Sequence, residues 1–275
     1  MVCRMKTKAI YLTTTLLLVS SSLVLGDSAA GQLQLRYGDS SGNCTLSVRQ
    51  NIKAGQNGIE AKRSFAMDLE FSDAHDAVSF KINNARGSYT AHDMTQRLPA
   101  SNLTGQRFVL SKADNGRAFE RIDADVDPAI PVGQISGADY SIGLALADIL
   151  PILPQGPVGV GSSWTTMQDT RSLEGWAWAS GSLSSEHVIT DIDQVNGHSI
   201  VSVTSKAHAL LGKTESGPQY GGEGELSRTS EWQFDANDGR LLSLSMRQNT
   251  SGSNRLPQGE VGVRQLTKVE FKMKN

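Results

Sequence analysis

The chain has 275 residues, a formal net charge of −2 and only 6% aromatic residues. It has no stretch rich in lysine or arginine, which argues against nucleic acid as a partner. Its two cysteines are too few for a disulfide framework.

Residues 1–26 predict a secretory signal peptide. Three basic residues precede an apolar stretch at 9–26, and small residues follow it, which is the pattern of a cleaved export signal. The stretch is interrupted by Ser and Thr, whereas a membrane span needs roughly 20 mostly apolar residues. We therefore expect an exported protein, periplasmic or extracellular, that is not transmembrane after signal cleavage.

Apolar and polar residues alternate with a period of two through most of the remaining chain, which predicts β-strands. In the first such segment Leu33, Leu35 and Tyr37 share one face. Further alternating segments lie at 45–52, 64–71, 78–82, 176–183, 187–192, 199–205, 225–234, 241–248 and 262–273.

Three dipeptides predict tight turns between strands: Asn115-Gly116, Asn196-Gly197 and Asp238-Gly239. Such pairs supply the positive φ angles that hairpins require. The last 100 residues therefore predict an antiparallel meander of about five or six strands.

Two short helices are expected between the strands. The first spans 136–150, with an apolar stripe that ends before Pro151, and the second is a turn or two at 92–99. After each helix comes a proline and then Gly-x-x-aromatic, at Gly105 and again at Gly161. This repetition predicts two similar halves, about 27–133 and 134–275, within a single β-rich domain at 27–275.

The expected fold class is mainly β (α+β). We expect curved antiparallel sheets or a half-barrel in two similar halves, with short helices packed on the concave side.

The glycine-rich stretch at 150–164 does not carry a nucleotide-binding motif. A phosphate loop needs a Lys after its last Gly, and a nucleophile elbow needs G-x-S-x-G. The stretch has neither, and Pro154 and Pro157 interrupt it. No cofactor is therefore predicted.

The same stretch resembles a secreted bacterial protein family of unknown function, over roughly residues 138–275. The shared pattern P-x-x-P-V-x-V-G-x-x-W is followed by F-D-x-x-x-G-x-L. The matching positions here are Pro154, Pro157, Val158, Val160, Gly161, Trp164, Phe234, Asp235, Gly239 and Leu241. In outline this resemblance implies a half-barrel like the carriers of lipoproteins and lipids in the bacterial envelope.

Aromatic and aliphatic side chains are the candidate ligand-binding residues. We expect them either to pack in the core or to line an apolar cavity under the 136–150 helix, which would act as a lid. They are Trp164, Trp176, Trp178, Trp232, Phe234, Ile142, Leu146 and Ile149.

No metal site is predicted. His187 and His198 flank the Asn196-Gly197 turn and could face each other, although surface strand positions are the simpler interpretation. The carboxylates Asp123, Asp125 and Asp127 lack the calcium-loop pattern, and whether they bind calcium stays open.

The sequence favours an exported envelope protein that binds or carries an apolar ligand, either a lipid or a lipidated segment, without catalysis. Two alternatives stay open: a structural or adhesive envelope protein, and a hydrolase on a β scaffold. The oligomeric state is not indicated.

Overall fold

The computed structural model describes residues 32–55, 58–74, 77–92, 94–98, 100–113, 116–121, 129–131, 139–141, 146, 150–169, 181–212, 223–256 and 259–274. Gly31–Asn275 forms one compact unit. Its strands are β1 (Ser41–Ala54), β2 (Ile59–Ala74), β3 (Ala77–Ala91), β4 (Met94–Leu98), β5 (Arg107–Ala113), β6 (Ala118–Arg121), β7 (Ala129–Pro131), β8 (Asp139–Ser141), β9 (Ser163–Asp169), β10 (Ser182–Val195), β11 (His198–Leu211), β12 (Gly224–Asp235), β13 (Arg240–Leu256) and β14 (Gly259–Met273). One 3-10 helix, η1 (Ala100–Leu103), lies between β4 and β5.

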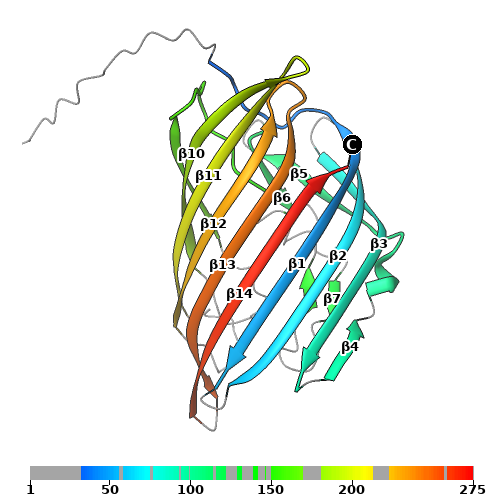
Figure 1. Cartoon of the computed structure of the whole chain (residues 1–275), viewed down its shortest axis with the longest axis vertical. Coiled ribbons are helices and arrows are strands. Elements are labelled where there is room, and N and C mark those ends of the chain that lie inside the picture. Colours follow the sequence, from blue (N-terminus) through cyan, green and yellow to red (C-terminus); the bar gives the residue numbers. More distant parts are fainter. Residues whose placement is uncertain are drawn as a thin grey trace, which may run out of the picture. The chain divides into compact units, whose positions relative to one another are not determined.

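Twelve strands form one antiparallel sheet (Figure 1). The order is β6-β5-β3-β2-β1-β14-β13-β12-β11-β10-β9, with β4 paired to β3, while β7 and β8 form a separate pair. The first and last long strands, β1 and β14, lie side by side in the middle. The predicted C-terminal meander is confirmed as β10–β14.

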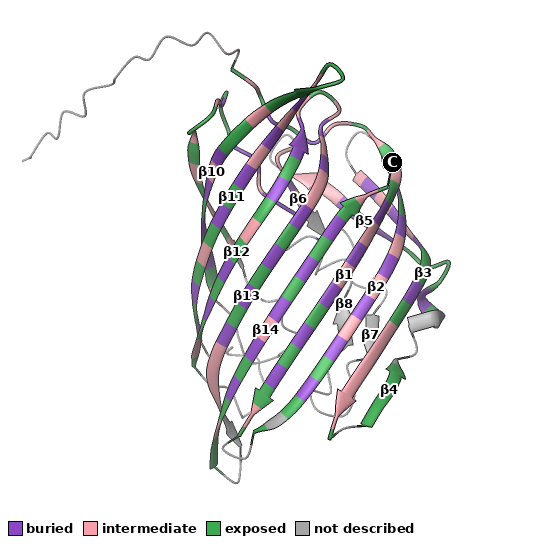
Figure 2. Ribbon diagram, in the orientation of Figure 1, coloured by how far each residue is buried: buried purple, intermediate pink, exposed green. Residues whose placement is uncertain are grey.

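Each long strand buries alternate residues (Figure 2). On β1, Leu46 and Val48 are buried and pair with Met67 and Phe65 of β2, whereas Arg49 is exposed. One face of the sheet, called here the inward face, therefore carries the core, as the period-two pattern predicts.

The sheet curls strongly. Along the sheet, β6 and β12 are seven strand-to-strand steps apart, which would be about 33 Å if the sheet were flat. Yet the Tyr37 ring lies 4.4 Å from Phe119 of β6 and 5.5 Å from Phe234 of β12, between ring centroids. The two ends of the strand path, β6 and β9, do not pair among the described residues, so the sheet stays open.

The expectation of short helices packed on the concave side is wrong. The element described against the inward face is an extended segment, residues 150–158, called here the strap. Pro151, Pro154 and Pro157 remove three backbone donors and disfavour helical conformation in the residues before them, so the strap stays extended.

Neither predicted helix is described as one. Residues 139–141 of the first form strand β8, and Leu146 and Leu150 are buried and joined by a hydrogen bond of one helical turn at 3.0 Å. The rest of 136–150 lies outside the described residues. The second is strand β4, because the chain reverses at His92, whose φ is +49°, and pairs back on β3.

The first predicted strand, 32–37, is extended, and the β-bridge described for it is an isolated one between Leu33 and Val158 of the strap. Its predicted face is correct, since Leu35 and Tyr37 are buried. Tyr37 N–H donates to the Gly116 carbonyl at 2.7 Å, and Gly38 N–H donates to the Gly239 carbonyl at 2.9 Å. This segment therefore ties the β5–β6 turn to the β12–β13 turn.

Within the described ranges, no residue belongs to a helix long and apolar enough to cross a bilayer. The predicted signal peptide lies outside the described residues, and both it and the two similar halves stay predictions.

Replacement of Gly239 by any residue with a Cβ is expected to destabilise the fold. Its φ is +66°, and an added Cβ would overlap the Gly38 backbone nitrogen. In Gly239→Ala we expect about 2–4 kcal/mol of lost stability, from left-handed strain of about 1 kcal/mol and overpacking of about 1–3 kcal/mol. Denaturant unfolding measures it.

The matched control is Gly197→Ala in the β10–β11 turn, where φ is +83° but no atom lies within 4 Å of an added Cβ. It should lose only about 1 kcal/mol. Equal losses in the two variants would contradict the close backbone contact between Gly38 and Gly239.

Candidate functional site

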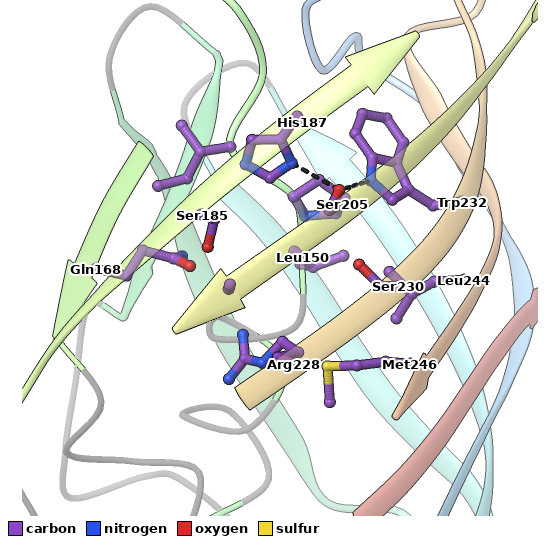
Figure 3. Close-up of a pocket in the computed structure, with 13 residues that line it drawn as sticks. Leu150, Gln168, Ser185, His187, Ser205, Arg228, Ser230, Trp232, Leu244 and Met246 are labelled. Atoms are coloured by element: carbon purple, nitrogen blue, oxygen red, sulfur yellow. Dashed lines mark hydrogen bonds between the residues drawn. The ribbon is translucent and has the colours of Figure 1, made fainter. Parts of the chain in front are cut away.

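A small pocket lies between the strap and the inward face of β9–β13 (Figure 3). Its volume is about 30 Å³, enough for roughly one water molecule. Apolar side chains on one part of the wall include Leu150, Leu244 and Met246, while Ser185 and Arg228 stand on another part. The pocket is therefore amphipathic, with the strap as one of its walls.

Side chains hold the strap in place through its backbone carbonyls. The Tyr37 hydroxyl donates to the Pro151 carbonyl at 2.9 Å, and Trp164 Nε1 donates to the Ile152 carbonyl at 2.9 Å. The Arg117 guanidinium donates to the Leu153 carbonyl at 3.4 Å, and Leu153 N–H donates to the Arg117 carbonyl at 2.8 Å. Because the strap has no ladder of its own in this part, these bonds replace the pairing that a strand would have.

A histidine network borders the pocket. His187 Nδ1 and Ser205 Oγ lie 2.7 Å apart, and His187 Nε2 lies 2.9 Å from Thr166 Oγ1. Trp232 Nε1 donates to Ser205 Oγ at 3.0 Å. Trp164 stacks on the imidazole, with ring centroids 4.9 Å apart. The network links four strands, β9 to β12, through hydrogen bonds, and Trp164 of β9 adds a ring contact.

Burial lowers the pKa of His187 to about 4, so the imidazole is neutral at pH 7. Both ring nitrogens face hydroxyl groups rather than a carboxylate among the described residues. A serine–histidine pair used in hydrolysis needs a group that orients the histidine and stabilises its charged form. The contacts described fit a structural hydrogen-bond network.

A continuous line of polar side chains crosses the inward face beside this network. Each member is the register partner of the next, from β3 across β2, β1, β14 and β13 to β12. The line, called here the polar row, consists of Tyr89, Arg63, Gln50, Thr267, Gln248 and Arg228. Apart from Tyr89, which is half-buried, every member is at least 92% buried.

Members of the polar row toward β12 are hydrogen-bonded. Arg228 Nε donates to Gln248 Oε1 at 3.0 Å within the row, and Gln265 Nε2, outside the row, donates to Thr267 Oγ1 at 3.1 Å. Arg228 also lines the pocket, so the row and the pocket form one site.

His198, Asp235 and Asp238 gather at the β12–β13 turn. Burial opposes ionisation of Asp235, but hydrogen bonds from Asp238 N–H, His198 and Asn237 N–H outweigh it and lower the pKa of that carboxyl. Arg240 Nε also lies 3.8 Å from Asp235. The cluster is a turn capped by hydrogen bonds to Asp235, and the Arg240 guanidinium supplies the positive charge beside its carboxylates.

The predicted ligand-binding residues that are described all belong to the main core. Trp232, Phe234 and Leu146 are buried, and Trp164 packs partly buried against them. Ile142, Ile149, Trp176 and Trp178 lie outside the described residues, as do Asp123, Asp125 and Asp127.

One other sequence interpretation changes. His187 does not face His198, because its register partner is Ser205 and it is 94% buried. Cys44 is fully buried, and burial raises the pKa of its thiol to about 12.

The sequence reasoning missed the polar row. A signal was present, because Arg63 and Gln50 occupy inward positions in strands whose inward residues are otherwise mostly apolar. Polar residues in phase with a buried face are the feature that could have identified it.

No protein-family model matches the chain, and no curated protein matches it in sequence. A solved structure of lipovitellin, described for its lipid–protein interactions, matches with a TM-score of 0.50 and 11% identity over 86% of this chain. The chain spans 25% of the lipovitellin chain. An outer membrane channel from Pseudomonas putida F1 matches over 90% of this chain and all of its own, at 9% identity. Its TM-score of 0.24 does not indicate a shared fold.

The buried histidine predicts a pH-dependent stability. The unfolded chain protonates His187 near pH 6.5, whereas the folded protein does so near pH 4. Between these values the unfolded state binds more protons, so the free energy of unfolding falls with decreasing pH, by up to about 3 kcal/mol. His187→Gln should remove this part of the pH dependence in denaturant titrations at pH 7 and pH 4.

His208→Gln, at an exposed position of β11, is the control and should keep the wild-type pH dependence. If His187→Gln and the wild type lost stability in parallel as the pH falls, the neutral buried imidazole would be wrong.

Proposed function

We propose that this chain is an exported envelope protein that binds an apolar ligand, a lipid or a lipidated segment, on the inward face of its sheet without catalysing a reaction. The observation that carries the proposal is the strap. A curled sheet with one apolar face has that face covered, over the pocket, by an irregular proline-rich segment rather than by a strand or helix.

The strap is the part of this cover that a ligand can displace. Six hydrogen bonds and three buried apolar side chains, Leu150, Leu153 and Val158, hold it, and together they contribute roughly 12 kcal/mol. A buried sixteen-carbon chain gains about 12 kcal/mol at about 0.8 kcal/mol per CH₂. The apolar burial of such a chain is therefore comparable to the cost of moving the whole strap.

The likeness to lipovitellin supports this proposal at the level of the fold. A related sheet in a protein described for its lipid–protein interactions is consistent with a lipid on the inward face here. The basic residues and apolar stretch at the start of the sequence support export, and with it a periplasmic or extracellular location.

Protein purified from its native source in mild detergent-free buffer should carry acyl lipid. We expect mass spectrometry of its organic extract to show one or a few lipid classes in near-stoichiometric amount. A lipid-free preparation that also fails to take up a fluorescent fatty acid would contradict the proposal.

Loosening the strap should speed uptake. Tyr37→Phe with Trp164→Phe removes two donors to strap carbonyls and leaves an aromatic ring at each position, at a stability loss of about 1–3 kcal/mol from the lost hydrogen bonds. We expect a several-fold faster association of a fluorescent fatty acid in stopped-flow measurements, because the strap opens more often.

The control is Ser64→Ala, which removes one side-chain hydrogen bond, to Ser88 at 2.8 Å, on the outer face. It should leave the association rate unchanged. An unchanged rate in the strap variant as well would show that ligands do not enter beneath the strap.

A further inference from the structure

The polar row differs between its two ends. At the β12 end, Arg228 bonds to Gln248. At the other end, Arg63 Nε, the Tyr89 hydroxyl and Gln50 Oε1 are buried, and none of these three atoms has a hydrogen-bond partner among the described residues. They lie on three adjacent strands, since Gln50 pairs with Arg63 and Arg63 pairs with Tyr89.

Arg63 is the unusual member. Arg63 is 95% buried, and its guanidinium carbon lies 5.8 Å from the centroid of the Tyr89 ring. An arginine stays charged in proteins, and a buried charge without a counter-charge is strongly unfavourable. Burial accordingly lowers the pKa of the Arg63 guanidinium.

The neighbouring strands supply no carboxylate to this arginine. Strands β1 and β3 contain no Asp or Glu, and the described carboxylates of β2 at Glu60, Asp68 and Glu70 occupy the opposite, outer face. Unpaired buried polar groups in native proteins call for an explanation by function or by a bound group.

Apolar side chains flank the trio on both sides along the strands. Val48 and Phe65 belong to the main core, and Ile52, Ala61 and Val263 form a smaller cluster on the other side. A ligand that places a charged group at Arg63 would therefore place its remaining atoms against hydrocarbon.

We propose that Arg63, Tyr89 and Gln50 form a head-group site for an amphiphile with a single anionic group. This inference rests on the proposed function and names the chemical class of its ligand. A carboxylate or phosphate accepts hydrogen bonds from the guanidinium and the Tyr89 hydroxyl, and Gln50 Oε1 accepts one from a hydroxyl of the same head group.

The test compares head groups on one acyl chain. Three fluorescent probes share a tail-labelled sixteen-carbon chain: the free fatty acid, its methyl ester and the lysophosphatidate. Equilibrium titrations at pH 8 with the full mature chain give the three affinities. We expect at least one anionic probe to bind about tenfold to a hundredfold more tightly than the ester, and the preferred anion identifies carboxylate or phosphate as the ligand group.

Two variants locate the effect. Arg63→Met should reduce the anionic probes to the affinity of the ester while leaving the ester unchanged, and Arg63→Lys should restore part of the preference. Arg264→Met, which removes an exposed guanidinium of β14, should keep the wild-type ratios. Without ligand, Arg63→Met should unfold at an equal or higher denaturant concentration, because it replaces an uncompensated buried charge.

The outcomes separate the two proposals. Equal binding of acid, phosphate and ester by the wild type would overturn the head-group site and leave apolar ligand binding intact. Binding of none of the probes would overturn both. A preference for the anion that survives Arg63→Met, or a clear loss of stability in that variant, would overturn the assignment to Arg63.

Discussion

The structure depends on one constraint: a sheet with a single apolar face must keep that face out of water. Strands of 14–17 residues give β1, β11, β13 and β14 an inward face much larger than short loops can cover. Curling brings that face against itself, which is why one tyrosine ring can contact strands seven steps apart. Antiparallel pairing with hairpin turns permits this curl without a helical layer.

The strap shows how the remaining gap is closed. An extended segment over a core would bury unpaired carbonyls, and here the donors come from residues far apart in sequence, Tyr37, Trp164 and Arg117. Several residues of the two sequence patterns around 154–164 and 234–241 are contact points of this closure. Val158 pairs with Leu33, Trp164 holds Ile152, and Gly239 touches Gly38. Their spacing reflects where the strap and the N-terminal segment must meet the sheet, and it does not require catalytic chemistry.

The sequence predicts the strands, the turn at Asn196-Gly197 and the inward residues of most strands, because period-two burial and positive φ are local properties. The sequence-based prediction is wrong where tertiary contacts determine the secondary structure. The 92–98 segment has a helical composition but pairs with β3, and the prolines of 150–158 could signal either a loop or a strap. The meeting of β1 with β14, and therefore the alignment of Gln50 with Thr267, follows from pairing between strands far apart in the sequence, which no local pattern contains.

The inward face has an apolar region under the strap and a polar region at Arg63. The two differ in how many of their contacts the protein itself supplies, and this difference bears on ligand choice. In the apolar region, Leu150 and Leu153 of the strap contribute the same kind of hydrocarbon contacts that an acyl chain would contribute. The protein without ligand therefore loses little apolar burial there. At Arg63 the described chain provides no such substitute for an anion. Local rules broken at a fixed position without internal compensation tend to mark functional sites. Discrimination between ligands is therefore expected to come from the head group at Arg63, while the tail supplies affinity without selecting one apolar chain over another.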